Sequence, residues 1–215
     1  MFLPDSINTN YLVVIAGGSC SGKTSLANAL KVFFNSTLIF QDSFYCDQSQ
    51  RFNYDGGAVN FDHPDAIDWR LLELAIKQLL AGVTVDIPFY NFATHKREQS
   101  REQATARPVI ILDGTLVLNS SFIRSQACYK IFLDIPVELR RERRIIRDQA
   151  ERGRELQGIM RQFDTQVEPM HQRFVDTSKQ YADLVIDQKQ IKSRDDYAVF
   201  AQKISAKLSE IFPKN

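Results

Sequence analysis

Residues 17–24, GGSCSGKT, match the pattern G-x-x-x-x-G-K-[ST]. Glycines let the backbone N–H groups of such a turn point inward at phosphate oxygens, the lysine brings a positive charge to the β- and γ-phosphates, and the final hydroxyl can bind Mg²⁺. A glycine-rich turn that merely starts a helix is the alternative, but a predicted strand before the loop and a predicted helix after it give the setting that the motif requires. The residues predicted to bind a nucleoside triphosphate are Gly17, Gly18, Ser19, Cys20, Ser21, Gly22, Lys23, Thr24 and Ser25.

Two aspartates follow short apolar segments further along the chain. Asp42 comes after TLIF (residues 37–40), and Asp113 comes directly after VIIL (residues 109–112). In a doubly wound parallel sheet, ligands bind outside the carboxyl ends of the strands, so both carboxylates should reach the same crevice as the phosphate loop. They could serve there as a general base and as support for a metal ion. Each could instead cap a helix or form a turn, to which aspartate is well suited.

Residues 139–154 contain seven arginines and three acids, a local net charge of +4 in a chain whose total is +1. Phosphoryl transfer depends on positioning and on stabilising negative charge, so cations are needed around the phosphates. Two other interpretations exist. The segment could be a solvated helix face with ion pairs inside the helix, or a nucleic-acid patch, although no aromatic platform or recognition motif accompanies the arginines.

Short apolar segments alternate with longer amphipathic ones along most of the chain. The pattern predicts strands at residues 11–16, 37–40, 109–112, 130–135 and 183–187, and helices at residues 24–34, 65–81, 136–152, 155–181 and 198–212. Pro169 is expected to interrupt or kink the fourth of these helices. Residues 83–92 predict a half-exposed strand or hairpin arm, residues 95–108 are charged without apolar periodicity, and residues 46–63 predict a long functional loop. Buried strands that alternate with helices predict an α/β fold with a parallel sheet covered on both faces.

Composition sets the broad class of the protein. The chain has 215 residues, 27 Lys and Arg, 26 Asp and Glu, and 44% hydrophobic residues, which predicts one large domain and argues against a protein that mainly coats nucleic acid or anionic membrane. Cys20, Cys46 and Cys128 form no C-x-x-C pair, so a disulfide scaffold or zinc site is not expected. The N-terminal MFLPDSINTN lacks the pattern of a leader, and no apolar run approaches a membrane span. We therefore expect a cytoplasmic protein.

Several further motifs occur in a fixed order after the phosphate loop: QDSFY (residues 41–45), NFDHPDAID (60–68), IPFYNFATHKR (87–97), ILDG (111–114), RRIIRDQAERGR (143–154) and SKQYADLVI (178–186). With these motifs the chain resembles the uridine kinase (uridine-cytidine kinase) family over nearly its whole length. The resemblance implies transfer of the ATP γ-phosphate, with Mg²⁺, to the 5′-hydroxyl of uridine, with cytidine as a second substrate. It also implies a homo-tetramer and a P-loop NTPase-type three-layer sandwich that has a five-stranded parallel sheet, a β-hairpin insertion and an Arg-rich helical lid.

The resemblance also assigns roles to residues. It implies that Asp42 is the base and acts with Lys23, and that Asp62 binds the ribose hydroxyls. Thr24 and Asp113 would support the metal, Asp113 standing where the family usually has Glu. The nucleoside-binding residues would be Asp62, Tyr90, Phe92, His95, Arg144, Arg154 and Gln162, and Arg147 and Arg152 would face the triphosphate.

Some of these residues have ordinary alternatives on residue pattern alone. His95 could be a surface or packed histidine, and Tyr90 and Phe92 could be core residues of a hairpin. To His63 and His171 we assign no role.

We expect a single kinase domain over residues 1–215, in which residues 83–108 form a hairpin over the nucleoside and residues 139–160 form the lid-like region. Two other functions stay open. One is a related P-loop kinase for another small-molecule alcohol, and the other is a nucleotide-binding regulator without transfer activity.

Overall fold

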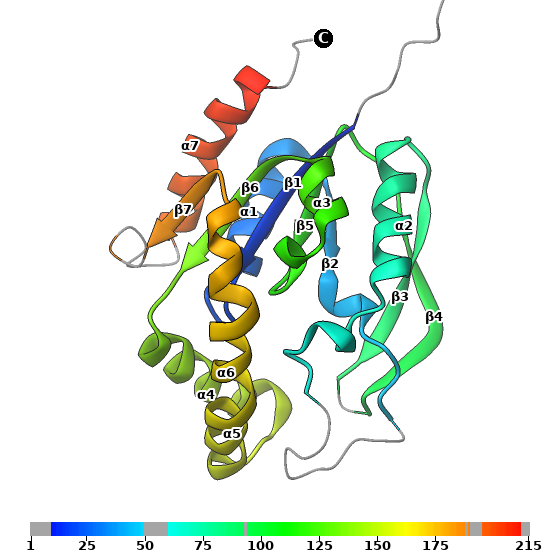
Figure 1. Cartoon of the computed structure of the whole chain (residues 1–215). Helices are drawn as coiled ribbons and strands as arrows, with labels where there is room; N and C mark the ends of the chain where they lie inside the picture. The colour runs from blue at the N-terminus through cyan, green and yellow to red at the C-terminus, as the bar shows by residue number, and fades with distance from the viewer. Residues whose placement is uncertain (1–9, 50–59, 93, 188, 190–194, 212–215) are drawn as a thin grey trace, which may run out of the picture.

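Five apolar segments form one parallel sheet in the computed structural model, which describes residues 10–49, 60–92, 94–187, 189 and 195–211 (Figure 1). The strand order is β2-β5-β1-β6-β7, and every neighbouring pair is parallel. The α/β class with a five-stranded parallel sheet is therefore confirmed. The strands are β1 (Tyr11–Gly17), β2 (Thr37–Phe40), β5 (Val109–Asp113), β6 (Ala127–Asp134) and β7 (Leu184–Asp187).

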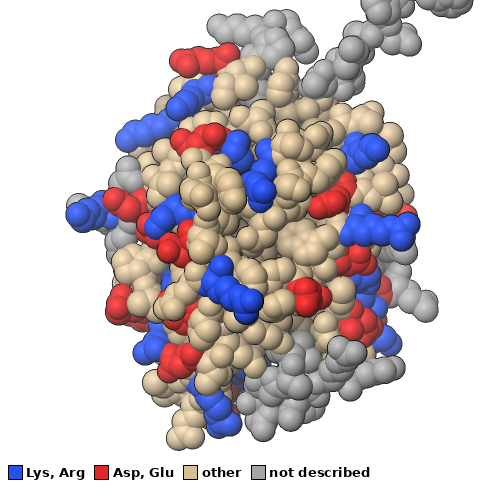
Figure 2. All heavy atoms as spheres, in the orientation of Figure 1, with Lys and Arg blue, Asp and Glu red and all other residues tan. Residues whose placement is uncertain are grey.

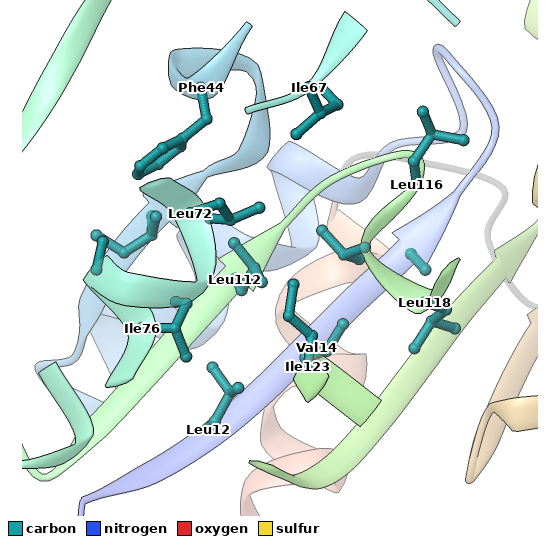
Figure 3. Close-up of a cluster of buried hydrophobic side chains, with 14 of the residues drawn as sticks. Leu12, Val14, Phe44, Ile67, Leu72, Ile76, Leu112, Leu116, Leu118 and Ile123 are labelled. Carbon is teal, nitrogen blue, oxygen red and sulfur yellow. The ribbon is translucent and has the colours of Figure 1, made fainter. Parts of the chain in front are cut away.

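Both faces of the central strand are buried, which is why β1 is apolar at successive positions. Leu12 and Val14 point into one core cluster and Val13 and Ile15 into the other, because successive side chains of a strand alternate between its faces. Helices α2 (Trp69–Leu80) and α3 (Ser121–Gln126) cover the first face, where Figure 3 shows their side chains against the strands. Helices α1 (Lys23–Phe34) and α7 (Asp195–Ile211) cover the second. Full burial of one such aliphatic side chain contributes about 1.5–3 kcal/mol.

The charged stretch after residue 95 is a strand. β3 (Val85–Asn91) pairs antiparallel with β4 (Lys96–Ala104) as a separate two-stranded sheet beside α2 (Figure 1). Arg97 of β4 joins this hairpin to the chain that follows β2: its Nε and Nη2 donate to the carbonyl oxygen of Tyr45 (3.1 and 2.8 Å), and its Nη1 donates to Asp68 Oδ2 (3.0 Å). Pairing with β3 therefore forms a strand from residues that show no apolar periodicity of their own.

The second half of the chain contributes a stack of helices at one end of the sheet (Figure 1). α4 (Val137–Arg152) and α5 (Leu156–Gln162) are followed by a helical run that passes through Pro169. Pro169 is expected from the sequence to interrupt or kink this helix; it does not interrupt the run, and the change there is one of hydrogen bonding. The hydrogen-bond pattern changes to π-helical on both sides of the proline, and such turns lie inside otherwise continuous helices. The run consists of η4 (Phe163–Val167), α6 (Glu168–Met170), η5 (His171–Val175) and η6 (Asp176–Tyr181).

Three short 3₁₀ turns complete the described elements: η1 (Gln41–Phe44), η2 (Pro64–Ala66) and η3 (Val117–Asn119). The helix expected from residue 65 begins later, at Trp69, because Asp68 caps it by accepting the Leu71 N–H at Oδ1 (3.1 Å). Residues 50–59 of the long loop predicted at 46–63 lie outside the described residues, as does most of the N-terminal segment judged to lack a leader.

Candidate active site

The phosphate loop lies between the end of β1 and the start of α1. Lys23 is buried and its Nζ donates to the carbonyl oxygen of Gly18 (2.9 Å), so the lysine closes the loop that it belongs to. Gly22 has a φ of 97°, and a Cβ at this position would overlap the hydroxyl of Tyr197. Glycine is therefore required at residue 22 both by the left-handed backbone and by the close approach of α7.

A cavity of about 940 Å³ begins at this loop. Of the residues predicted to bind the triphosphate, Ser19, Cys20, Gly22, Lys23, Thr24, Ser25, Arg147 and Arg152 line it. The other predicted loop residues contact protein instead: a Cβ on Gly17 would meet Leu133, one on Gly18 would meet Arg140 and His171, and Ser21 is fully buried. Their contribution is the shape of the loop.

Thr24 and Asp113 lie together at the floor of this cavity. The Thr24 hydroxyl donates to Asp113 Oδ2 (2.7 Å), and Asp113 is 4% exposed. Burial raises the pKa of Asp113 to about 6, although Lys23 and the Thr24 hydroxyl act in the opposite direction. Asp113, the last residue of β5, thus reaches the start of α1, as expected because the carboxyl ends of the neighbouring parallel strands β1 and β5 lie at the same edge of the sheet.

Thr24 and Asp113 supply only part of a metal's ligands, which suits Mg²⁺ better than an ion whose ligands all come from protein. Within the part of the chain that the structure describes, no group of three or more His, Cys, Asp or Glu could hold a metal ion. Mg²⁺ is commonly bound through one or two carboxylates, substrate phosphates and several waters. A hydroxyl and a carboxylate beside the phosphate loop match that partial set of ligands.

A second cavity, of about 530 Å³, adjoins the first. Asp42, on the turn η1 directly after β2, lines both cavities. Asp62 lines the smaller one, where burial raises its pKa and Arg144 opposes the shift. Burial also raises the pKa of Tyr45, with Asp42 and Asp62 as the next causes, so both carboxylates lie near this phenol.

Aromatic rings form one wall of the smaller cavity. Phe61 stacks on His95 with ring centroids 4.8 Å apart, and Tyr45 packs edge-on against Phe61 at 5.4 Å. Burial, followed by Arg154 and Arg152, lowers the pKa of His95 to about 4, so its imidazole is neutral near pH 7.

Most residues predicted for the nucleoside meet in this cavity. Asp62, Phe92, His95, Arg144, Arg154 and Gln162 line it, whereas Tyr90 lines the larger cavity and packs against Tyr45 (5.3 Å between centroids). The sequence interpretation missed four lining residues, Tyr45, Phe61, Thr115 and Glu151. Tyr45, Phe61 and Glu151 belong to the motifs quoted above and Thr115 follows ILDG, so proximity to a motif is the signal that could have found them.

The arginines of α4 and the following turn form the opposite wall. Arg147 and Arg152 line both cavities, while Arg144 and Arg154 line only the smaller one. Gln162 lies between the latter two: its Oε1 accepts from Arg144 Nη2 (3.0 Å) and Arg154 Nη1 (2.7 Å). The interpretation of this segment as a purely solvated helix face is therefore wrong for these arginines.

Other charged residues of segment 139–154 form ion pairs away from the two cavities. Arg141, for example, pairs with Asp164 at the surface. On the face of the molecule seen in Figure 2, acidic and basic side chains are interspersed. A membrane-spanning helix is likewise not found among the described residues, since none of their helices is both long and apolar enough.

Comparison with known proteins places this site in a family. The model of the phosphoribulokinase / uridine kinase family matches residues 12–193. A uridine kinase of Brevibacillus brevis is 39% identical over 178 residues, which are 81% of this chain and 83% of the relative. A uridine kinase of Halobacterium salinarum is 37% identical over 179 residues, 82% of this chain and 80% of the relative.

A solved structure supports the same fold. The structure of a "possible uridine kinase" from Bacillus stearothermophilus matches with a TM-score of 0.62 and 19% identity, and the match covers 83% of this chain and 89% of that one. At 19% identity this likeness shows the fold alone, whereas the family model and the curated relatives show the family. The chain belongs to the phosphoribulokinase / uridine kinase family.

Proposed function

We propose that this chain transfers the γ-phosphoryl group of ATP to the 5′-hydroxyl of uridine, with cytidine as a second substrate, and releases UMP or CMP and ADP. The observation that carries the proposal is the position of Asp42, which lines both a cavity that begins at the phosphate loop and an adjoining cavity with aromatic and carboxylate walls. Relatives named uridine kinase, at 37–39% identity, support the choice of acceptor.

The larger cavity would hold the triphosphate. The loop N–H groups and Lys23 bind the phosphate oxygens, and Arg147 and Arg152 approach from the opposite wall. Thr24 and Asp113 are the residues that would hold Mg²⁺, which when bound neutralises charge on the β- and γ-phosphates. The Lys23 ammonium donates to the carbonyl oxygen of Gly18, and we expect it to turn to the phosphate oxygens when ATP binds.

The smaller cavity would hold the nucleoside. Asp62 accepts hydrogen bonds from the ribose hydroxyls, and the pyrimidine lies against the rings of Phe92, His95 and Tyr90. A neutral His95 can both donate and accept a hydrogen bond, which suits the carbonyl and N–H edge of uracil. Arg144 and Arg154 complete this side, and Gln162 holds them in place.

The reaction follows from this arrangement. The 5′-oxygen attacks the γ-phosphorus in line, its proton passes to Asp42, and the bond from the γ-phosphorus to the oxygen that leaves with ADP breaks. Lys23 and the arginines stabilise the negative charge on the equatorial oxygens, which is the main source of catalysis in such a transfer.

The proposal also includes the surroundings of the site. We propose that the hairpin segment, residues 83–108, and the Arg-rich segment, residues 139–160, cover the nucleoside and the phosphates and exclude water during transfer. The family resemblance further leads us to propose a tetramer in the cytoplasm. Analytical ultracentrifugation would decide the oligomeric state, and a monomer at micromolar concentration would contradict it.

The test is a panel of acceptors. Uridine, cytidine, other nucleosides and unrelated small alcohols are each incubated with ATP and Mg²⁺, and ADP release is followed. We expect acceptor-dependent release with uridine and cytidine, and none with 5′-deoxyuridine, which lacks the attacking hydroxyl. Turnover with only an unrelated alcohol would favour the related-kinase alternative, and release that no acceptor changes would favour a regulator.

A further inference from the structure

Asp148, a residue with no role in the proposed reaction, has the most crowded electrostatic surroundings of the site. It lies on α4, and its side chain is 0% exposed. Four arginines surround this one carboxylate, and all four line the nucleoside cavity: Arg144, Arg147, Arg152 and Arg154.

Each carboxylate oxygen of Asp148 pairs with the arginines proposed for one of the two substrates. Oδ1 receives the two proposed for the triphosphate, Arg147 at 2.8 Å and Arg152 at 3.7 Å. Oδ2 receives the two proposed for the nucleoside, Arg154 at 3.2 Å and Arg144 at 3.6 Å. A single rigid group thus touches the cationic walls of both subsites.

The charge balance requires this carboxylate. Burial would raise the pKa of Asp148, but Arg147, Arg144 and Arg152 outweigh it and lower the pKa, so the group is ionised. The arginines also repel one another: after burial, Arg147 is the next cause that lowers the pKa of Arg152. One carboxylate holds the four guanidinium groups together yet leaves a positive excess for phosphates.

We propose that Asp148 is a positioning residue that couples the triphosphate subsite to the nucleoside subsite through its two carboxylate oxygens, a proposal that rests on the proposed function. When phosphates draw Arg147 and Arg152 away from Oδ1, the carboxylate bonds more fully to Arg144 and Arg154 and orders them for the nucleoside. Each substrate then raises the affinity for the other by the same factor, as linkage requires.

The experiment is calorimetric titration of a non-hydrolysable ATP analogue with and without uridine, on the wild type and on Asp148→Asn. Asparagine keeps the shape of the side chain and removes its charge. We expect uridine to tighten analogue binding at least about fivefold in the wild type and by less than about twofold in the variant. The control is Asp164→Asn. It removes the surface partner of Arg141, an arginine that lies on α4 like Asp148, and uridine should still tighten analogue binding as much as in the wild type.

The outcomes separate this proposal from the proposed function. A wild type that binds the analogue but not uridine contradicts the proposed acceptor. Asp148→Asn is then compared for analogue binding alone, which the proposal requires to tighten, because Arg147 and Arg152 no longer have to leave a carboxylate. Full mutual tightening in Asp148→Asn overturns the coupling role.

A second variant keeps the test open if Asp148→Asn does not fold. Arg154→Gln removes a ligand of Oδ2 on the nucleoside side, so the carboxylate holds Arg147 and Arg152 more firmly. We expect the analogue alone to bind several-fold more weakly. Arg161→Gln removes an exposed arginine of α5 as the charge control and should change binding by less than about twofold. Equal effects of the two variants would overturn the proposal.

Discussion

At the scale of single residues, the proposed transfer depends on Asp42. It follows β2 on a short 3₁₀ turn and lines both cavities, so it can reach a hydroxyl placed in one and a phosphate placed in the other. Lys23 and Asp113 also line the cavity proposed for the triphosphate, but an ammonium group cannot accept a proton, and Asp113 accepts a hydrogen bond from Thr24. We therefore propose Asp42, and not these two residues, as the base.

Asp42→Asn should lower kcat at least about 100-fold, since asparagine cannot accept the proton of the 5′-hydroxyl, while the dissociation constant of ATP stays near that of the wild type. Asp86→Asn, at an exposed position of β3, is the matched control. Steady-state kinetics with uridine and ATP measures both. Near-normal turnover in Asp42→Asn would reject the assignment of the base.

At the scale of elements, the hairpin can serve the nucleoside cavity only if it is held against the turn that carries Asp42. Arg97 supplies this connection with two bonds to the Tyr45 carbonyl and one to Asp68. Such a planar, three-point contact is available to a guanidinium but not to an ammonium group. The motif containing Arg97 was visible in the sequence, but its role depends on contacts between residues about fifty positions apart.

Arg97→Lys should raise the KM for uridine about tenfold, because a hydrogen-bonded charge contact is worth roughly 1.5–3 kcal/mol and its loss lets the hairpin shift. The KM for ATP should change by less than about twofold, since the phosphate loop lies on other elements. Arg107→Lys, at an exposed arginine just after β4, should leave both constants unchanged. Equal increases in both KM values would indicate general destabilisation instead.

At the scale of the whole molecule, features set by local sequence patterns could be predicted, and features set by tertiary contacts could not. The strands around β1 and the phosphate loop follow from apolar runs and glycine spacing, which are local. The charged β4 becomes a strand only by pairing with β3, and Asp148 looks like any helix acid until four arginines converge on it. Pro169 shows the same limit, because its helix continues by changing to π-helical turns.

The free energy of unfolding should depend on pH through the protonation of His171. Burial, followed by Arg140, lowers its pKa to about 4, while Glu168, Asp176 and Asp134 act in the opposite direction. The unfolded chain takes up this proton near the ordinary pKa of 6.5. The stabilisation of the folded state by neutral His171 is therefore complete above about pH 6.5 and is lost as the pH falls toward 4.

Urea unfolding at several pH values in this range checks the effect. The free energy of unfolding should fall with decreasing pH in the wild type, and it should fall less steeply in His171→Gln, which has no proton to gain. Identical slopes in the two proteins would show that His171 does not contribute.

The central claim is that the 5′-hydroxyl of uridine receives the γ-phosphoryl group of ATP. Phosphorus-31 NMR of the wild type with ATP, Mg²⁺ and uridine observes the transfer directly. We expect a 5′-phosphomonoester resonance of UMP to grow at the same rate as the resonances of ADP, with no inorganic phosphate. Release of inorganic phosphate in step with ADP, or a phosphomonoester at any other hydroxyl, would contradict it.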